Sequence, residues 1–189
     1  MPSEFAGRTA LVTGAASGIG AATARWLADR GIGELVLVDI DAPGLERFEA
    51  ACPLRRHVGD VADPLLWDRI EADLGKVDHA LINAGIANGC PLVDQDFAEW
   101  KRMLAINLDG AFLGLRAVLR VMKRSGGKSI VLTSPVAGIK PLPATAAYGS
   151  SKAAIAHLAR IAAAEHAGDG IRINAVAPGR VDTPIWTKT

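Results

Sequence analysis

The stretch Leu11-Val-Thr-Gly-Ala-Ala-Ser-Gly-Ile-Gly20 decides the fold of this 189-residue chain. It joins an apolar, β-branched run that starts at Thr9 to a helix-forming run that starts at Ala21, through a turn with three glycines. Glycines in such a turn permit positive φ and let a ligand approach the backbone, and the N-terminus of the following helix attracts a phosphate. The spacing is G-x-x-x-G-x-G rather than the G-x-G-x-x-G of the dinucleotide fingerprint. Taken alone, the stretch therefore also fits an ordinary turn between a strand and a helix.

Patterns typical of buried strands and of helices alternate along the rest of the chain. After the first strand, apolar runs lie at 34–39, 54–58, 79–83, 128–133 and 171–176, and helical patterns at 19–30, 43–51, 63–74, 97–122 and 147–167. This alternation predicts an α/β fold, a doubly wound parallel sheet of Rossmann type with helices on both faces, formed by a single domain over residues 1–189. Ligands bind such sheets at the carboxyl ends of the strands. Gly14, Asp39, Asp60, Asn83 and Ser134 all fall at predicted strand ends.

The composition argues against several other classes of protein. Half of the residues are hydrophobic, 22% are charged and the net charge is +1, so the charge balance favours neither a nucleic acid nor a membrane as partner. No apolar run reaches the length of a membrane span, and we expect no secretory signal at the N-terminus. Cys52 and Cys90 lie far apart and are expected to stay reduced in a cytoplasmic protein. The four histidines are scattered without the spacing of a metal site.

Asp39 closes the second predicted strand, 25 residues after Gly14. A dinucleotide-binding fold places the acid that binds the adenosine ribose at this point. A carboxylate accepts hydrogen bonds from the two ribose hydroxyls and repels a 2′-phosphate, and none of Ala15, Ala16 and Ile40 supplies a compensating positive charge. The sequence therefore predicts NAD rather than NADP. The competing interpretation is an aspartate that is merely exposed at a strand end.

Tyr148 and Lys152 are four residues apart and therefore share one face of the last predicted helix. An ammonium group close to a phenol favours the phenolate and lowers a pKa that is normally about 10. Such a tyrosine can exchange a proton with an alcohol near neutral pH. The pair is a weak signal alone, since tyrosine and lysine meet at this spacing by chance in many helices. Here it follows a dinucleotide-type turn and the fifth predicted strand.

Together these features resemble the short-chain dehydrogenase/reductase family over essentially the whole chain. The resemblance rests on Thr13-Gly14-x-x-x-Gly18-Ile19-Gly20, Asp60-Val61, Asn83-Ala84-Gly85, Asn107, Tyr148-x-x-x-Lys152 and Pro178-Gly179. It implies a Rossmann-type sheet, an NAD cofactor and a small alcohol or ketone as substrate. It also implies a homodimer or homotetramer, because the helix that carries the tyrosine commonly forms a dimer contact in this family. The apolar stripe Ile155, Leu158 and Ala162 on that helix fits either the core or such an interface.

The resemblance further implies a role for each of these residues. Tyr148 would be the acid and base, Lys152 would bind the nicotinamide ribose and depress the pKa of the tyrosine, and Asn107 would hold a water that relays protons to the lysine. The implied cofactor-binding residues are Thr13, Gly14, Ser17, Gly18, Ile19 and Gly20 at the pyrophosphate, Asp39 at the adenosine ribose, Asp60 and Val61 at the adenine, Asn83, Ala84 and Gly85 along the cleft, and Tyr148, Lys152, Pro178, Gly179 and Thr183 at the nicotinamide end.

Position 135 departs from the family pattern. The family usually has a serine thirteen residues before the tyrosine, where its hydroxyl donates to the substrate oxygen and stabilises the charge that develops there. This chain has Pro135, which has no donor to offer. Ser134 is the neighbouring residue, but successive side chains on an extended segment point to opposite faces. Two interpretations remain: a local backbone shift lets Ser134 serve, or the donor is absent.

The end of the chain is a second departure. The sequence stops at Thr189, whereas family members usually continue with a further strand, a helix and a loop that covers the substrate. We expect either a naturally short protein without the C-terminal strand and substrate lid, or an incomplete sequence. The leading hypothesis is an NAD-dependent oxidoreductase that interconverts a secondary alcohol and a ketone by hydride transfer, with Tyr148 as acid and base. The alternative, favoured by Pro135 and the missing lid, is a dinucleotide-binding module with little or no turnover.

Overall fold

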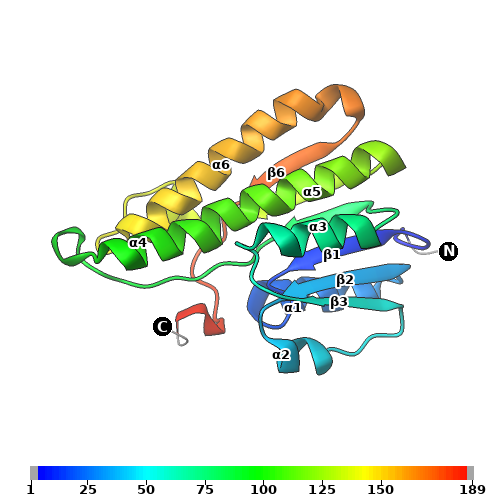
Figure 1. Cartoon of the computed structure of the whole chain (residues 1–189), viewed down its shortest axis with the longest axis horizontal. Coiled ribbons are helices and arrows are strands. Elements are labelled where there is room, and N and C mark those ends of the chain that lie inside the picture. The colour runs from blue at the N-terminus through cyan, green and yellow to red at the C-terminus, as the bar shows by residue number, and fades with distance from the viewer. Residues whose placement is uncertain (1–3, 187–189) are drawn as a thin grey trace.

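The computed structural model describes residues 4–186 and contains one six-stranded parallel sheet (Figure 1). Its strands are β1 (Thr9–Thr13), β2 (Glu34–Asp39), β3 (Leu54–Val58), β4 (His79–Ile82), β5 (Ser129–Thr133) and β6 (Arg172–Val176). They lie in the order β3-β2-β1-β4-β5-β6, and each neighbouring pair is parallel. This order reverses direction at β1, as in a doubly wound sheet. The predicted Rossmann-type fold is therefore confirmed.

Helices connect the strands and cover both faces of the sheet (Figure 1). They are α1 (Gly18–Asp29), α2 (Ala42–Glu46), α3 (Pro64–Asp73), α4 (Phe97–Leu104), α5 (Gly110–Ser125) and α6 (Ala146–His166). α1 and α2 pack on β1, β2 and β3, whereas α3, α5 and α6 cover the opposite face. Strand side chains alternate accordingly: Leu11, Val36 and Ile130 belong to the core beneath α5 and α6, and Val12 and Leu37 to the core beneath α1 and α2. No helix within residues 4–186 is long and apolar enough to cross a membrane.

The helix predicted over 97–122 contains a π turn. α4 continues directly into a five-residue π-helical segment, Ala105–Asp109, which continues into α5. A π turn adds a residue to one turn of the helix and is frequent at functional sites. In this protein it lies at Asn107, whose side chain is fully buried and hydrogen-bonded to the backbone that follows β4. The periodicity of the sequence did not reveal this irregular turn.

The helix predicted over 43–51 is shorter than expected and ends at Glu46. Arg56 on β3 donates from Nε to the carbonyl of Leu45 (2.9 Å) and from Nη2 to the carbonyl of Phe48 (2.8 Å). Carbonyl groups at a helix end lack partners inside the helix, so these two bonds allow the chain to leave the helix early. Apart from these two helices, the predicted bounds agree with the structure to within one residue.

Candidate active site

The glycine turn between β1 and α1 is closely packed. Gly14 has φ of +67°, a conformation that favours glycine. A Cβ at Gly20 would overlap the carbonyl oxygen of Gly14. Ser17 precedes the first turn of α1, and its side chain does not cap the helix. The first-turn N–H groups of α1 thus have no side-chain cap at the place where a phosphate would bind.

A hydrogen-bond network joins the carboxyl ends of β1, β4 and β5. Thr13 Oγ1 accepts from the backbone N–H groups of Asn83 (2.8 Å) and Ala84 (3.0 Å). Asn83 Nδ2 donates to the carbonyl of Thr13 (3.3 Å), and its Oδ1 accepts from Thr133 Oγ1 (3.0 Å). The structure thus brings Thr13, Asn83 and Ala84 together. Sequence reasoning missed Thr133, although its place at the end of the fifth predicted strand was a usable signal.

Asp39 lies half-buried at the end of β2, beside the glycine turn. Its Oδ2 accepts from the backbone N–H of Ala16 (2.9 Å) and its Oδ1 from that of Asp41 (3.0 Å). Both oxygens are therefore held in place and retain lone pairs for further donors. Asp60 follows the neighbouring β3 and is exposed, and its carboxylate accepts from the backbone N–H of Ala62 (2.9 Å).

Tyr148 and Lys152 lie on one face of α6 and are almost fully buried, with exposures of 4% and 2%. Lys152 Nζ is 5.7 Å from the centroid of the tyrosine ring. Burial raises the pKa of Tyr148 and lowers the pKa of Lys152 from 10.5 to about 8. The expected lowering of the tyrosine pKa is therefore not found in this structure. Burial disfavours the charged form of both groups, which outweighs the attraction between phenolate and ammonium.

Asn107 and Gly85 complete the surroundings of the lysine. Asn107 Oδ1 accepts from the backbone N–H of Ile86 (2.8 Å), and its Nδ2 donates to the carbonyl of Ile86 (2.9 Å) and to Ser151 Oγ (3.2 Å). A Cβ at Gly85 would lie 2.9 Å from Asn107 Oδ1 and 3.1 Å from Lys152 Nζ. The structure thus brings Gly85, Asn107 and Lys152 into contact. Sequence reasoning missed Ser151, which stands between Tyr148 and Lys152 on the same helix.

Pro135 follows β5 and is half-buried. The hydroxyl of Ser134, which is 1% exposed, donates to the carbonyl of Lys152 at 2.6 Å. The backbone N–H groups on either side of Pro135 are also paired, Ser134 N with Val176 O (2.9 Å) and Val136 N with Pro178 O (3.1 Å). The hydroxyl of Ser134 therefore donates within the protein, and hydrogen bonds fix the backbone on both sides of Pro135.

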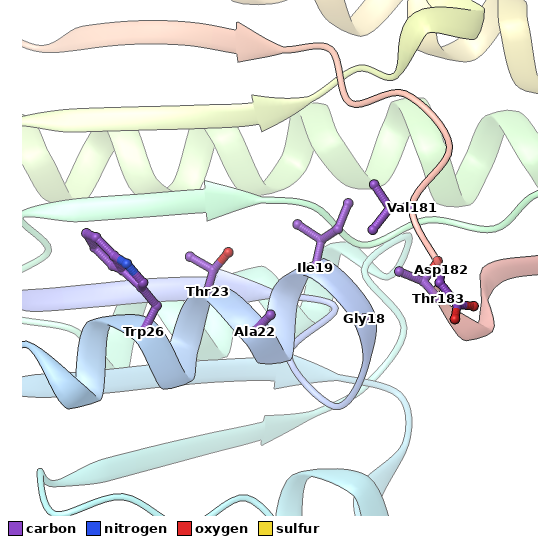
Figure 2. A pocket seen from close by; sticks show the side chains of 8 residues that line it. All are labelled: Gly18, Ile19, Ala22, Thr23, Trp26, Val181, Asp182 and Thr183. Carbon is purple, nitrogen blue, oxygen red and sulfur yellow. The ribbon is translucent and has the colours of Figure 1, made fainter.

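A hollow of about 410 Å³ opens beside the glycine turn, between α1 and the segment after β6 (Figure 2). It is lined by Gly18, Ile19, Ala22, Thr23 and Trp26 from α1 and by Val181, Asp182 and Thr183 from the later segment. Thr183 thus lies next to Gly18 and Ile19, as a shared cofactor site requires. Gly179 is exposed, and within residues 4–186 nothing beyond its chain neighbours lies within 4 Å of the place where a Cβ would be.

The sequence model of the family described as short chain dehydrogenase matches residues 8–189. This chain belongs to the short-chain dehydrogenase family. It is similar to cis-4-hydroxycyclohexanecarboxylate dehydrogenase of Sinomonas cyclohexanicum, with 40% identity over 201 residues that cover 98% of this chain and 78% of the relative. Membership makes it an oxidoreductase with a Rossmann nucleotide-binding fold.

Two solved structures show the same arrangement of strands and helices at higher than 30% identity. The crystal structure of levodione reductase matches this short-chain dehydrogenase with a TM-score of 0.91 and 34% identity, over 98% of this chain and 76% of that one. The crystal structure of NAD⁺-bound xylitol dehydrogenase matches with a TM-score of 0.88 and 39% identity, over 93% of this chain and 71% of that one.

Proposed function

We propose that this short-chain dehydrogenase interconverts a secondary alcohol and a ketone with NAD as cofactor. The observation that carries the proposal is the meeting of Tyr148, Lys152, Asn107 and Gly85 at the carboxyl end of the sheet. A nicotinamide cofactor held in this site would supply the hydride acceptor for the carbinol carbon. Tyr148 Oη takes the hydroxyl proton of the alcohol, and it returns a proton to the oxygen when a ketone is reduced.

The residues present fit a nicotinamide dinucleotide. The glycine turn leaves no room for side chains, and the N-terminus of α1 has no side-chain cap, which suits a pyrophosphate. We assign Thr13, Gly14, Ser17, Gly18, Ile19 and Gly20 to the pyrophosphate, Asp39 to the adenosine ribose, Asp60 and Val61 to the adenine, Asn83, Ala84 and Gly85 to the cleft, and Pro178, Gly179 and Thr183 to the nicotinamide end.

We assign the preference for NAD over NADP to Asp39. Two backbone N–H groups hold its carboxylate at the end of β2, where it accepts from the ribose hydroxyls and repels a 2′-phosphate. The similarity to an NAD⁺-bound xylitol dehydrogenase supports this choice. Equal affinity for NADPH and NADH in a fluorescence titration would contradict it.

Lys152 and Asn107 support the proton transfer at Tyr148. The buried ammonium group binds the nicotinamide ribose, and its positive charge, 5.7 Å from the centroid of the tyrosine ring, favours the phenolate against the opposing effect of burial. Asn107 sits in the π turn against Gly85 and Lys152, where a water held by this turn would relay protons to the lysine.

The test is Tyr148→Phe, with Ser150→Ala as the matched control because Ser150 is exposed on the same helix. Loss of the acid and base should lower kcat about 100-fold or more, measured from the absorbance of NADH with a panel of secondary alcohols. The Kd for NADH and the turnover should both stay unchanged in Ser150→Ala. Undiminished turnover by Tyr148→Phe would overturn the proposed mechanism.

A second candidate function is a dinucleotide-binding module with little or no turnover. Pro135 and the internally bonded hydroxyl of Ser134 favour it, because together they remove a donor for the substrate oxygen. This candidate predicts NADH binding without turnover by the unmodified chain, and it predicts that Tyr148→Phe changes no measurable property.

We also propose a homodimer that forms through α5 and α6. A hollow of about 250 Å³ runs between these helices, and its rim includes the exposed side chains of Phe112 and Ile161. Ile155 and Ala162 of the predicted stripe are instead buried in the core. Ile161→Glu should yield monomers in light scattering, and a monomeric unmodified chain would refute the proposal. We further propose that residues 1–189 form a single domain and that the protein is cytoplasmic, in keeping with the unpaired cysteines Cys52 and Cys90.

A further inference from the structure

Hydroxyl groups at the end of β5 and at the start of α6, the helix that carries Tyr148, have no proton left for a substrate. Apart from the hydroxyl of Tyr148 itself, four hydroxyls that are not exposed lie in these two places, and each donates inside the protein. The bonds run from Ser134 to the carbonyl of Lys152 (2.6 Å), from Ser151 to the carbonyl of Tyr148 (2.7 Å), from Thr145 to the carbonyl of Leu142 (2.7 Å) and from Thr133 to Asn83 Oδ1 (3.0 Å). A hydroxyl has one proton, so none of the four can also donate to a reacting oxygen.

Backbone groups at position 135 do not replace the missing hydroxyl. Proline has no N–H, and the N–H of Val136 is paired with Pro178 O. A shift of register that would turn Ser134 toward the substrate would break the bonds of Ser134 to Lys152 and Val176. The charge that develops on a reacting oxygen at Tyr148 therefore lacks the second hydroxyl donor that such a reaction uses.

We propose that the substrate itself supplies this donor, and that it is a polyol or its keto form. The inference rests on the proposed oxidoreductase function and names its substrate class. A hydroxyl two carbons from the reacting carbon closes a six-membered ring onto the reacting oxygen, a size that permits a usable hydrogen-bond angle. The bond strengthens as the oxygen gains negative charge, so it stabilises the transition state more than the bound alcohol.

The reaction balances without any further group. The carbinol C–H bond breaks and its hydride passes to NAD⁺, while the O–H bond breaks and its proton passes to the phenolate of Tyr148. The carbonyl double bond forms between the same carbon and oxygen. The second hydroxyl keeps its proton and only donates a hydrogen bond to the reacting oxygen.

The probes are pentane-2,4-diol and its mono-methyl ether, 4-methoxypentan-2-ol, with NAD⁺. The ether keeps the second oxygen and its electron withdrawal but cannot donate, and it is larger than the diol by one methyl group. For the unmodified chain, kcat/KM should favour the diol by about 10- to 100-fold, the effect expected of one donor to a developing oxyanion. In Pro135→Ser the ratio of kcat/KM for the diol to kcat/KM for the ether should fall toward one, mainly because kcat/KM for the ether rises. Pro143→Ser is the matched control, since Pro143 is exposed in the same loop and should leave the ratio unchanged.

Two half-buried side chains offer N–H donors: Trp100 packs against the apolar cluster that contains Tyr148, and Asn88 follows Ala87 of that cluster in the chain. Asn88→Leu and Trp100→Phe should leave the ratio of diol to ether unchanged, and a loss of ether turnover in either variant would assign the donor role to the protein and overturn the proposal. If Pro135→Ser does not fold, as judged by its Kd for NADH, Pro135→Ala should keep the ratio of the unmodified chain.

The remaining outcomes separate this inference from the proposed function. Equal kcat/KM for diol and ether in the unmodified chain, with measurable turnover of both, would overturn the inference and leave the oxidoreductase function standing. NADH binding without turnover of either probe by any variant would overturn both.

Discussion

Lys152→Met should stabilise the fold at neutral pH while it removes activity. Lys152 is 2% exposed, and its pKa falls from 10.5 to about 8 because burial disfavours the ammonium form. Methionine has a similar length and no charge, and it adapts readily to an irregular apolar site. The substitution therefore removes a buried charge without leaving a large cavity. Turnover should be lost, because the proposed contact with the nicotinamide ribose is lost.

The magnitude follows from the size of the pKa shift. The fall of the pKa from 10.5 to about 8, at about 1.4 kcal/mol for each pKa unit, sets the cost of the protonated lysine at roughly 3–4 kcal/mol. The ammonium group also lies 5.7 Å from the Tyr148 ring centroid, a contact that returns about 0.5–2 kcal/mol. The free energy of unfolding at pH 7 should thus rise by about 1–3 kcal/mol in the variant.

The pH dependence has a definite sign. An unfolded lysine keeps its ordinary pKa, so between about pH 8 and pH 10.5 the unfolded chain binds more protons than the folded protein. The stability of the unmodified chain therefore rises with pH across this window. Below about pH 8 the lysine is protonated in both states and the full cost is present. The advantage of Lys152→Met should be constant there and should vanish as pH approaches 10.5.

Urea unfolding followed by circular dichroism, at several pH values between 7 and about 10.5, measures this difference. Other titrating groups cancel when each variant is compared with the unmodified chain at the same pH. Lys140→Met is the control, since Lys140 is exposed and should show no pH-dependent difference. A Lys152→Met protein that is less stable at pH 7, or a difference that stays flat with pH, would refute the reasoning.

Three further substitutions test other parts of the site. Asp39→Asn keeps the size of the side chain but removes its charge. The Kd for NADH should therefore rise about 10- to 100-fold, and discrimination against NADPH should weaken. Unchanged Kd values for NADH and NADPH would contradict the assignment of Asp39 to the adenosine ribose. Gly20→Ala places a methyl group on the Gly14 carbonyl and should cost about 1–3 kcal/mol or more in urea unfolding, unlike Gly75→Ala, where the space is open. Ser134→Ala removes the side-chain donor from the carbonyl of Lys152, which keeps its backbone partner within α6. It should cost about 0.5–1.5 kcal/mol, and an unaltered unfolding midpoint would show that the bond contributes nothing.

The order of strands and helices could be predicted because it depends on local patterns. A run such as Glu34–Asp39 is apolar enough to be buried on both faces, and the glycine turn marks the passage from strand to helix without reference to distant residues. The pairing of these strands follows from general rules on crossovers. The same rules place Thr13, Asp39 and Asn83 at one edge, as the structure shows.

Features that depend on tertiary contacts could not be predicted in this way. The early end of α2 follows from Arg56, which lies on β3 and reaches back to Leu45 and Phe48. The π turn at Asn107 spans only five residues within a long helical pattern, so periodicity did not detect it. The direction of the Tyr148 pKa shift was wrong at the sequence level because spacing reports the nearby ammonium but not the burial of both groups.

Ser134 and Pro135, the two residues that follow β5, have different roles. Ser134 ties the end of β5 to α6 at the carbonyl of Lys152, so it supports the fold and positions the lysine. Pro135 is only half-buried, and its φ of −55° lies in the range that proline prefers. A serine at 135 would therefore change the donors available to a substrate while costing the fold less than about 1 kcal/mol through the looser unfolded chain. Because fold and chemistry are separable at these two positions, position 135 can determine which substrates react without affecting whether the protein folds.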